Sequence, residues 1–294
     1  MYPINVTEYL ELTVKKYPDR AALRDGERSM TFREAREKAL ALAWKLREAL
    51  KGQSRKIIAV YMPKCLEAAI ADLAILYSGN AYMNLDVKSP VARTESILNQ
   101  TAPVLCLTLD SRHNLAKKWN PLPVEQLDGA LGADSEKIIL RDLDSLIDTD
   151  LLCLINTSGS TGVPKTVALN HRSFIDFTEA VKYAELAGRE IIGSLSPIIF
   201  DIFSFELCLM MAEGATIVLI PDSLAAFPAR MLELLAAEKV SFIFWVPTIM
   251  VNIANMKLLD HIPLPDLKMI WFAGEVFPTA KFNYWRVKMD LCLL

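Results

Sequence analysis

Short apolar segments alternate with helix-like segments along this chain, and the alternation limits the possible folds more than any other feature. Residues 56–62 and 104–109 have the apolar, β-branched character of buried strands, and a shorter strand is expected at Ala81–Leu85. The intervening segments, 66–76 and 93–100, have the length and spacing of helices. Because parallel strands are joined by crossover helices, the pattern predicts βαβ units and an α/β fold with a mostly parallel sheet that is covered on both faces.

Local signals predict where some elements begin. Thr31 and Glu34 have the spacing of a capping box, which places the start of a helix directly after Thr31. Ser173 is expected to cap a later helix in the same way. Residues 118–140 contain proline, glycine and acidic residues without a clear period, so they predict a surface connection with a strand embedded at 137–140.

Composition excludes several classes of protein. The 294 residues are 52% hydrophobic and 23% charged, as in soluble globular proteins, and the net charge of −3 gives no basic field for nucleic acid or an anionic membrane. No apolar stretch reaches the roughly 20 residues that span a bilayer, and the N-terminus has no apolar signal-peptide core, which together predict a cytoplasmic protein. Five scattered cysteines without CxxC spacing predict buried free thiols, and three histidines without zinc-site spacing predict no metal site.

Residues 156–165 (NTSGSTGVPK) combine in one loop the groups that bind polyphosphate. Such binding needs short hydroxyl side chains, backbone N–H groups exposed by glycine, and a fixed positive charge. The loop supplies them at Thr157, Ser158, Gly159, Ser160, Thr161, Gly162 and Lys165. It follows an apolar strand, where ligands bind in open α/β sheets, but it has neither the GxxxxGK[ST] nor the GxGxxG pattern. On composition alone, a solvated Ser/Gly turn explains the segment equally well.

The string SGSTGVPK resembles the phosphate-loop signature of the adenylate-forming superfamily, which includes amino-acid adenylation domains of nonribosomal peptide synthetases, D-alanine–carrier-protein ligases and acyl-CoA synthetases. Residues 30–34 and 76–86 resemble two structural motifs of the same superfamily. Two positions depart from its pattern, because Thr166 stands where glycine is usual and Asn84 stands where proline is usual.

The resemblance implies a large domain of two stacked, mostly parallel, doubly wound sheets with flanking helices. Its two interleaved α/β subdomains would cover roughly residues 1–170 and 171–294. One further motif of the superfamily is matched by Ala273, Gly274 and Glu275. Full-length members continue past it with a ribose-binding aspartate, a hinge and a mobile C-terminal domain that carries a catalytic lysine. No catalytic residue is therefore assigned, and the chain is expected to be an incomplete N-terminal AMP-binding domain.

Asp201 lies in an apolar run, PIIFDIFSFELCLMM, where an ionised carboxylate is costly to bury without a partner. One interpretation is that Asp201 caps the helix expected over residues 204–212. The other is that its partner is the ammonium group of a substrate. An aspartate in this motif holds the substrate's α-amino group in amino-acid-activating members, and Asp201 matches that position.

The resemblance to the superfamily also implies which residues form the other walls of the substrate site. The side-chain pocket would be lined by Ile202, Phe205, Phe244, Trp271 and Ala273, and adenine would lie beside Ala273, Gly274 and Glu275. The large aromatic residues suggest a small or apolar substrate. Ordinary core packing explains the aromatic residues as well, and Glu275 could instead face the positive N-terminal end of the next helix.

The implied reaction is attack of an amino-acid carboxylate on the α-phosphorus of ATP, with Mg²⁺ shielding the phosphates. It gives an aminoacyl-adenylate and pyrophosphate, and the thiol of a phosphopantetheinylated carrier protein would then accept the acyl group. Two alternatives remain open at this point: an acyl- or aryl-CoA-type ligase, and a catalytically inactive nucleotide-binding fragment.

Overall fold

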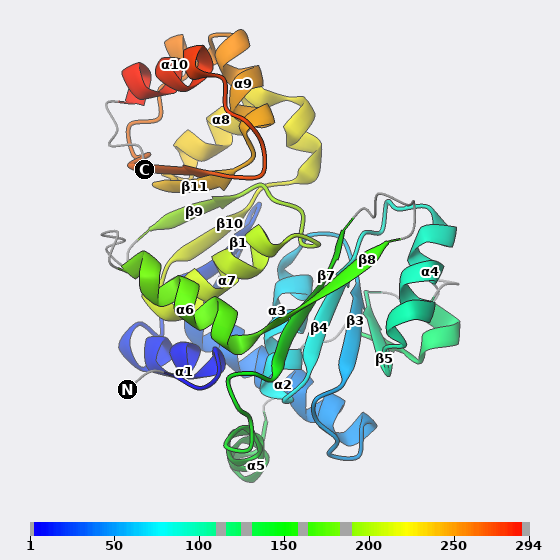
Figure 1. Cartoon of the computed structure of the whole chain (residues 1–294). Helices are drawn as coiled ribbons and strands as arrows, with labels where there is room; N and C mark the ends of the chain where they lie inside the picture. Colours follow the sequence, from blue (N-terminus) through cyan, green and yellow to red (C-terminus); the bar gives the residue numbers. More distant parts are fainter. Residues whose placement is uncertain (1–2, 110–115, 125–130, 158–163, 183–189, 290–294) are drawn as a thin grey trace.

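The computed structural model describes residues 3–109, 116–124, 131–157, 164–182 and 190–289. In this part of the chain the strands form two six-stranded sheets, ordered β12-β11-β9-β10-β1-β2 and β6-β5-β3-β4-β7-β8 (Figure 1). Neighbouring strands are parallel except at one edge of each sheet, where β1 and β2, and β7 and β8, pair antiparallel. The α/β fold with two mostly parallel sheets is therefore confirmed.

The first sheet takes strands from both ends of the described chain, because β1 and β2 precede every strand of the second sheet in sequence. Its strands are β1 (Ala21–Asp25), β2 (Arg28–Thr31), β9 (Ile191–Ser194), β10 (Thr216–Leu219), β11 (Phe242–Trp245) and β12 (Met269–Phe272). The strands of the second sheet are β3 (Ile57–Tyr61), β4 (Ala81–Leu85), β5 (Leu105–Thr108), β6 (Pro121–Pro123), β7 (Leu151–Thr157) and β8 (Lys165–Asn170).

Helices cover both faces of both sheets. They are α1 (Thr7–Lys16), α2 (Phe32–Ala49), α3 (Leu66–Tyr77), α4 (Val91–Thr101), α5 (Ala133–Leu143), α6 (His171–Lys182), α7 (Asp201–Glu213), α8 (Pro228–Ala237), α9 (Pro247–Asn255) and α10 (Thr279–Met289), with short 3-10 turns at Ala116–Trp119, Asp222–Ala226 and Leu258–Asp260. Helices α8, α9 and α10 pack on the outer face of the first sheet, and α4 packs on the outer face of the second (Figure 1).

The central layer explains why two helices are apolar on nearly every side. Helix α3 contacts strands of both sheets, and 11 of its residues are buried. Helix α7 packs on β9, β10, α1 and α6, and it is buried over Phe203–Met211. A helix that is apolar all round is stable only when packing covers its whole surface, so α3 and α7 bind the two sheets into one hydrophobic core.

The capping box at Thr31 is confirmed. The Thr31 hydroxyl accepts a hydrogen bond from the Glu34 backbone N–H, and the Glu34 carboxylate accepts one from the Thr31 backbone N–H at 2.7 Å. Asn170, rather than Ser173, caps α6: its Oδ1 accepts the Ser173 backbone N–H at 2.9 Å. The prediction for Ser173 was wrong because the helix begins earlier, at His171.

The strand predicted at 137–140 was also wrong, because these residues belong to helix α5. Ile139 and Leu143 are the buried residues of α5, four positions apart on one helical face. The four-residue run KIIL is too short to separate a strand from a helix by its apolar character, and the periodicity becomes visible only when Leu143 is included.

The cysteines within the described residues, Cys65, Cys106, Cys153 and Cys208, are buried and unpaired, as predicted. Burial raises the pKa of the Cys65, Cys106 and Cys153 thiols to about 12, so they are packed as neutral groups. Among the described residues, none of the helices has both the length and the apolar character needed to cross a membrane.

Candidate functional site

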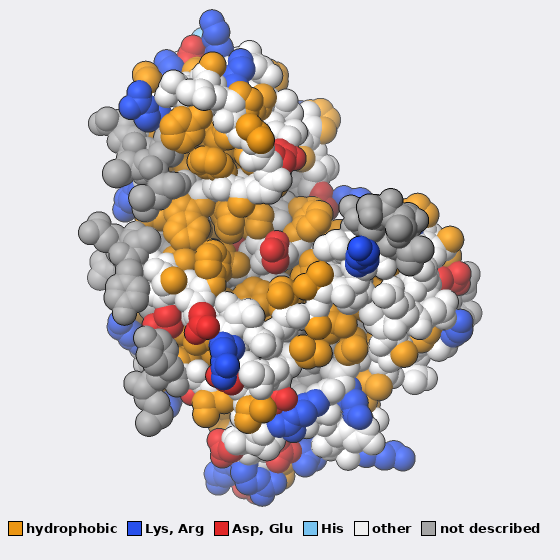
Figure 2. Space-filling model, in the orientation of Figure 1, with side chains coloured by type: hydrophobic (Ala, Val, Ile, Leu, Met, Phe, Trp, Pro, Cys, Tyr) orange, Lys and Arg blue, Asp and Glu red, His pale blue; other side chains and the backbone are white. Residues whose placement is uncertain are grey.

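A cavity of about 1150 Å³ lies where the C-terminal ends of strands from both sheets meet. The segments that follow β3, β4, β9, β10, β11 and β12 all contribute to its wall, together with α6 and the start of α7. Figure 2 shows apolar side chains gathered over this hollow, with isolated acidic groups among them. In open α/β sheets this edge is the usual place for ligands.

Asp201 is the first residue of α7 and lines the cavity with an exposed carboxylate. Its Oδ1 accepts a hydrogen bond from the Ile202 backbone N–H at 3.0 Å. The residue at the N-cap position is Phe200, so the capping interpretation does not describe Asp201. The prediction that the Asp201 carboxylate is buried, from which its role was argued, was also wrong. The fully buried carboxyl group of α7 belongs to Glu206.

Other charged groups on the cavity wall have partners. Asp222 pairs with Lys64 and Lys88, and Asp86 accepts a hydrogen bond from the Lys88 backbone N–H. Among the described residues, no cation lies within salt-bridge distance of Asp201. An exposed carboxylate without a counter-charge, on a mainly apolar wall, is suited to bind a cationic group of a ligand.

Aromatic rings fill one end of the cavity region. Phe205 lies nearly parallel to Trp271, with ring centroids 6.0 Å apart, and the edge of Phe244 contacts both rings. Phe205 and Phe244 line the cavity with Ile202 and Ala273, whereas Trp271 packs behind Phe205. Phe177 of α6, which was not predicted, also lines the cavity, and its ring centroid lies 4.5 Å from that of Phe205.

The Ala-Gly-Glu segment divides into two parts. Ala273 and Gly274 line the cavity, and Gly274 has a φ of +87°, which favours glycine. Glu275 points instead to the N-terminus of α9, where its Oε2 accepts hydrogen bonds from the Thr248 backbone N–H at 2.9 Å and from the Thr248 hydroxyl. Glu275 therefore faces the positive N-terminal end of a helix, as the second interpretation expected. That helix is α9, which precedes Glu275 in the chain, and not α10, which follows it.

The predicted phosphate loop is described only at its two ends. Thr157 and Lys165 face each other in the β7–β8 ladder, and the Thr157 hydroxyl donates to the Lys165 carbonyl at 3.2 Å. Ser158, Gly159, Ser160, Thr161 and Gly162 lie outside the described residues. Thr166, the departure from the family pattern, donates a cross-strand hydrogen bond to Asn156 Oδ1 at 2.8 Å.

The other departure also has a local partner. Asn84 is buried in β4, and its Nδ2 donates to Asp72 Oδ2 of α3 at 2.8 Å. Asp72 is fully buried, and burial raises the pKa of its carboxyl group well above the usual range. Asn84 thus supplies a donor to an acid in the core, which a proline at this position could not do.

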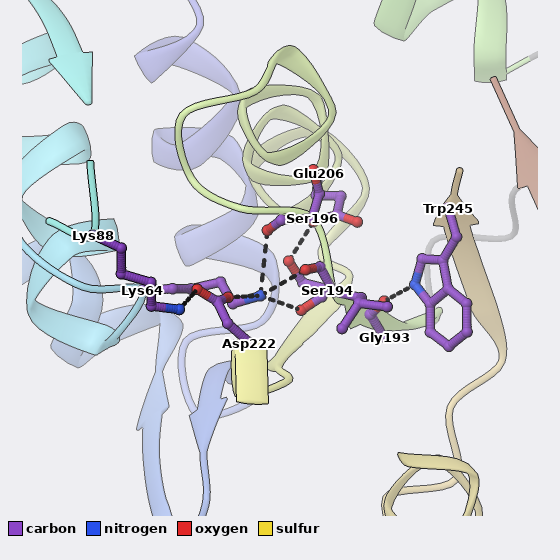
Figure 3. A network of polar contacts seen from close by, with 9 residues as sticks. Lys64, Lys88, Gly193, Ser194, Ser196, Glu206, Asp222 and Trp245 are labelled. Carbon is purple, nitrogen blue, oxygen red and sulfur yellow. Dashed lines mark hydrogen bonds and ion pairs between the residues drawn. The ribbon is translucent and has the colours of Figure 1, made fainter. Parts of the chain in front are cut away.

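A polar network on the cavity wall was not predicted at all (Figure 3). Lys64, which follows β3, has only 3% of its side chain exposed, and it contacts carbonyl oxygens at the end of β9. The Ser194 hydroxyl at the same strand end donates a hydrogen bond to Glu206 Oε2. Burial raises the pKa of Glu206 to about 8, although the Ser194 hydrogen bond opposes this.

A family model described as "AMP-binding enzyme" matches residues 10–292, nearly the whole chain. This chain belongs to the AMP-binding enzyme family. Bacitracin synthase 1 of Bacillus licheniformis is 31% identical over 269 residues, which are 91% of this chain and 5% of that protein. The L-proline--[L-prolyl-carrier protein] ligase of Pseudomonas fluorescens is 28% identical over an alignment of 295 positions, which covers 91% of this chain and 55% of that protein.

The fold agrees with that of a solved structure. The structure of VinN with L-aspartate superimposes with a TM-score of 0.83 at 18% identity, covering 99% of this chain and 75% of that one. The curated relatives named above are a synthase and a ligase, and the chain spans only about half, or far less, of their lengths. The sequence match thus shows that the chain belongs to the family, and the structural match shows that it has the same fold as VinN.

One sequence signal could have found Lys64. Ligands of open α/β sheets usually bind at the C-terminal edge of the parallel strands, and Lys64 stands two residues after the apolar strand 56–62. A charged side chain at that place is therefore a candidate for the cavity wall. Phe177 gave no such signal, because its contact with Phe205 joins two helices that are consecutive in the chain but connected by a long segment.

Proposed function

We propose that this chain binds ATP with Mg²⁺ and an amino acid, and that the carboxylate of the amino acid is activated as its adenylate. The observation that carries the proposal is Asp201, an exposed carboxylate without a counter-charge among the described residues, on the wall of a mainly apolar cavity in a member of the AMP-binding enzyme family. A substrate with an ammonium group beside its carboxylate satisfies this arrangement, whereas a fatty or aryl acid leaves Asp201 unused.

Each wall of the site has a role in this proposal. Asp201 binds the substrate ammonium, while Ile202, Phe205, Phe244 and Ala273 surround the side chain, with Trp271 supporting Phe205. Because the aromatic rings already contact one another, the space they leave suits a small or compact apolar side chain.

The nucleotide would lie across the remaining part of the cavity. Ala273 and Gly274 would lie against adenine, and Glu275, the next residue in the chain, would lie near it. Residues 157–162 and Lys165 would bind the phosphates, and the exposed Lys165 side chain at the start of β8 is compatible with this role. Magnesium would bind with ATP and lower the cost of bringing a carboxylate close to the phosphates.

The reaction balances as an attack by a carboxylate oxygen on the α-phosphorus. A new carbon–oxygen–phosphorus linkage forms, the bond from the α-phosphorus to the bridging oxygen breaks, and pyrophosphate leaves with that oxygen. The protein would contribute by positioning the two reactants and by stabilising charge. We further propose that a carrier-protein phosphopantetheine thiol accepts the acyl group. The name of the proline ligase includes a carrier protein, which supports this class of acceptor. We also propose that the protein acts in the cytoplasm.

Matched pairs of stable adenylate analogues test the proposal by calorimetric titration. Alanyl-sulfamoyl adenosine and propionyl-sulfamoyl adenosine differ only by the ammonium group, as do the valyl and isovaleryl compounds. A charge-assisted hydrogen bond contributes roughly 1.5–3 kcal/mol, so the best aminoacyl compound should bind about tenfold or more tightly than its amine-free partner. Asp201→Asn should remove most of this difference.

Three outcomes contradict the proposal. Equal binding of each pair would favour the acyl- or aryl-CoA-type ligase. Discrimination that survives in Asp201→Asn would mean that another residue binds the amine. If none of the analogues binds, the cavity is not an adenylate site. Amino-acid-dependent pyrophosphate–ATP exchange gives an independent readout of the full reaction.

A further inference from the structure

Lys64 connects the two sheets on the wall of the cavity that also holds the proposed amino-acid site. Its Nζ donates hydrogen bonds to the carbonyl oxygens of Leu195 at 2.9 Å, Ser194 at 3.2 Å and Ser196 at 3.3 Å (Figure 3). An ammonium group has three N–H donors, and that of Lys64 lies within hydrogen-bond distance of all three of these consecutive carbonyl groups. The lysine follows β3 of the second sheet, and the carbonyl groups lie at and just after the end of β9 of the first sheet.

The charge of Lys64 is balanced by a nearby acid. Asp222, which follows β10, lies 3.2 Å from Lys64 Nζ through Oδ1 and 2.8 Å from Lys88 Nζ through Oδ2. Burial lowers the pKa of Lys64, and Asp222 opposes that shift. Burial disfavours ionisation of Asp222 too, but the two lysines outweigh it and lower the pKa of Asp222. A buried charge is tolerated only when paired and hydrogen-bonded, as Lys64 is.

The segment that Lys64 contacts leads into the proposed binding residues. Residues 195–200 follow β9, all of them line the cavity, and Asp201 comes next at the start of α7. The carbonyl of Ser194 also accepts the Ile220 backbone N–H at 3.0 Å, and the Phe200 backbone N–H donates to Pro197 at 3.1 Å. The wall is therefore fixed at its start by Lys64 and β10 and at its end by a local turn.

We propose that Lys64 is a positioning residue that holds the wall segment 195–200 against the opposite sheet and thereby sets the place of the Asp201 carboxylate in the cavity. The inference rests on the proposed function for its effect on amino-acid binding. Its structural part, the ordering of residues 195–200, stands independently. No contact of Lys64 with a substrate is required.

Lys64→Met tests the proposal, because methionine keeps the apolar length of the side chain and removes the charge and its donors. The probes are Mg²⁺–ATP and the aminoacyl-sulfamoyl adenosine that binds the wild-type chain most tightly. We expect the Kd for the aminoacyl compound to rise by roughly tenfold to a hundredfold, the loss expected when the charge-assisted hydrogen bond between the ligand ammonium and Asp201 is broken, while the Kd for Mg²⁺–ATP changes less than about twofold. A loss of stability alone would weaken both.

Hydrogen–deuterium exchange gives the second readout. We expect faster exchange at the Ile220 and Phe200 amides in Lys64→Met. Lys288→Met is the matched control, since it removes the ion pair of Lys288 with Asp260 at 2.9 Å on α10 and should leave both readouts unchanged. If Lys64→Met does not fold, Asp222→Asn removes the counter-charge that keeps the buried Lys64 ionised; the weakened contacts of Lys64 with the three carbonyl groups should then give the same pattern at a smaller size.

The proposal is overturned if a folded Lys64→Met or Asp222→Asn variant leaves exchange at Ile220 and Phe200 unchanged. It is also overturned if the Kd values for both probes rise equally. If the wild-type chain binds none of the aminoacyl compounds, the proposed function fails, and the exchange rates alone then decide whether Lys64 holds the segment.

Discussion

Replacing Glu206 by glutamine should stabilise the protein, by an amount that grows with pH. Glu206 is fully buried in α7, and its Oε2 accepts a hydrogen bond from the Ser194 hydroxyl. Burial raises the pKa of its carboxyl group from 4.5 to about 8. Glutamine has nearly the same shape and keeps an acceptor for Ser194, but it cannot ionise, so the comparison isolates the cost of burying the charge.

The sign and size follow from proton linkage. Above pH 4.5 the unfolded chain releases a proton that the folded chain keeps up to about pH 8, so wild-type stability should fall with rising pH across this interval. Each pH unit corresponds to about 1.4 kcal/mol, so between pH 4.5 and pH 7 the wild-type protein should lose about 3 kcal/mol relative to Glu206→Gln. Other titrating groups are common to both proteins and cancel in the difference.

Urea unfolding followed by tryptophan fluorescence at several pH values between 4.5 and 7 measures this difference. Glu233→Gln, at an exposed position of α8, is the matched control and should show no comparable trend. A difference between wild type and Glu206→Gln that stays constant with pH would refute the reasoning. It would mean that Glu206 is ionised in the folded protein, with the ammonium of Lys64 as the compensating charge.

Three further predictions use other described contacts. Thr31→Ala removes the capping box of α2 and should lower the free energy of unfolding by about 1 kcal/mol in urea; an unchanged midpoint would contradict this. Burial lowers the pKa of His171 to about 4, so as pH falls from 6.5 toward 4 the wild type should lose about 3 kcal/mol of stability relative to His171→Asn, and parallel unfolding curves would argue against a neutral buried imidazole. Lys165→Ala should weaken Mg²⁺–ATP binding about tenfold in calorimetry, and unchanged affinity would remove this side chain from the phosphate site.

The regular elements were largely predictable because each leaves a local signal. The strand at Ala81–Leu85 and the helix after Thr31 begin where apolar pattern and capping residues place them. Helix α5 was missed because a four-residue apolar run is compatible with either element. Boundaries set by a neighbouring residue, as Asn170 sets the start of α6, were less predictable than the existence of the element.

The burial of individual acids in α7 could not be predicted from the apolar run that contains them. Asp201 and Glu206 are five positions apart, which places them about 140° apart around a helix, so one can face the cavity while the other faces the core. The apolar composition of the run gives the same expectation of burial for Asp201 and for Glu206. The contacts of Lys64 and Phe177 were beyond prediction for a different reason: each joins elements whose relative position depends on the packing of both sheets.

The structure of this chain bound to its tightest aminoacyl-sulfamoyl adenosine would show whether Asp201 binds the amine. We expect the ammonium group of the ligand within about 3 Å of the Asp201 carboxylate, with the ligand side chain against Phe205 and Phe244. A ligand whose ammonium group lies away from Asp201, or which occupies the cavity without contacting α7, would contradict the assignment of this site to an amino acid.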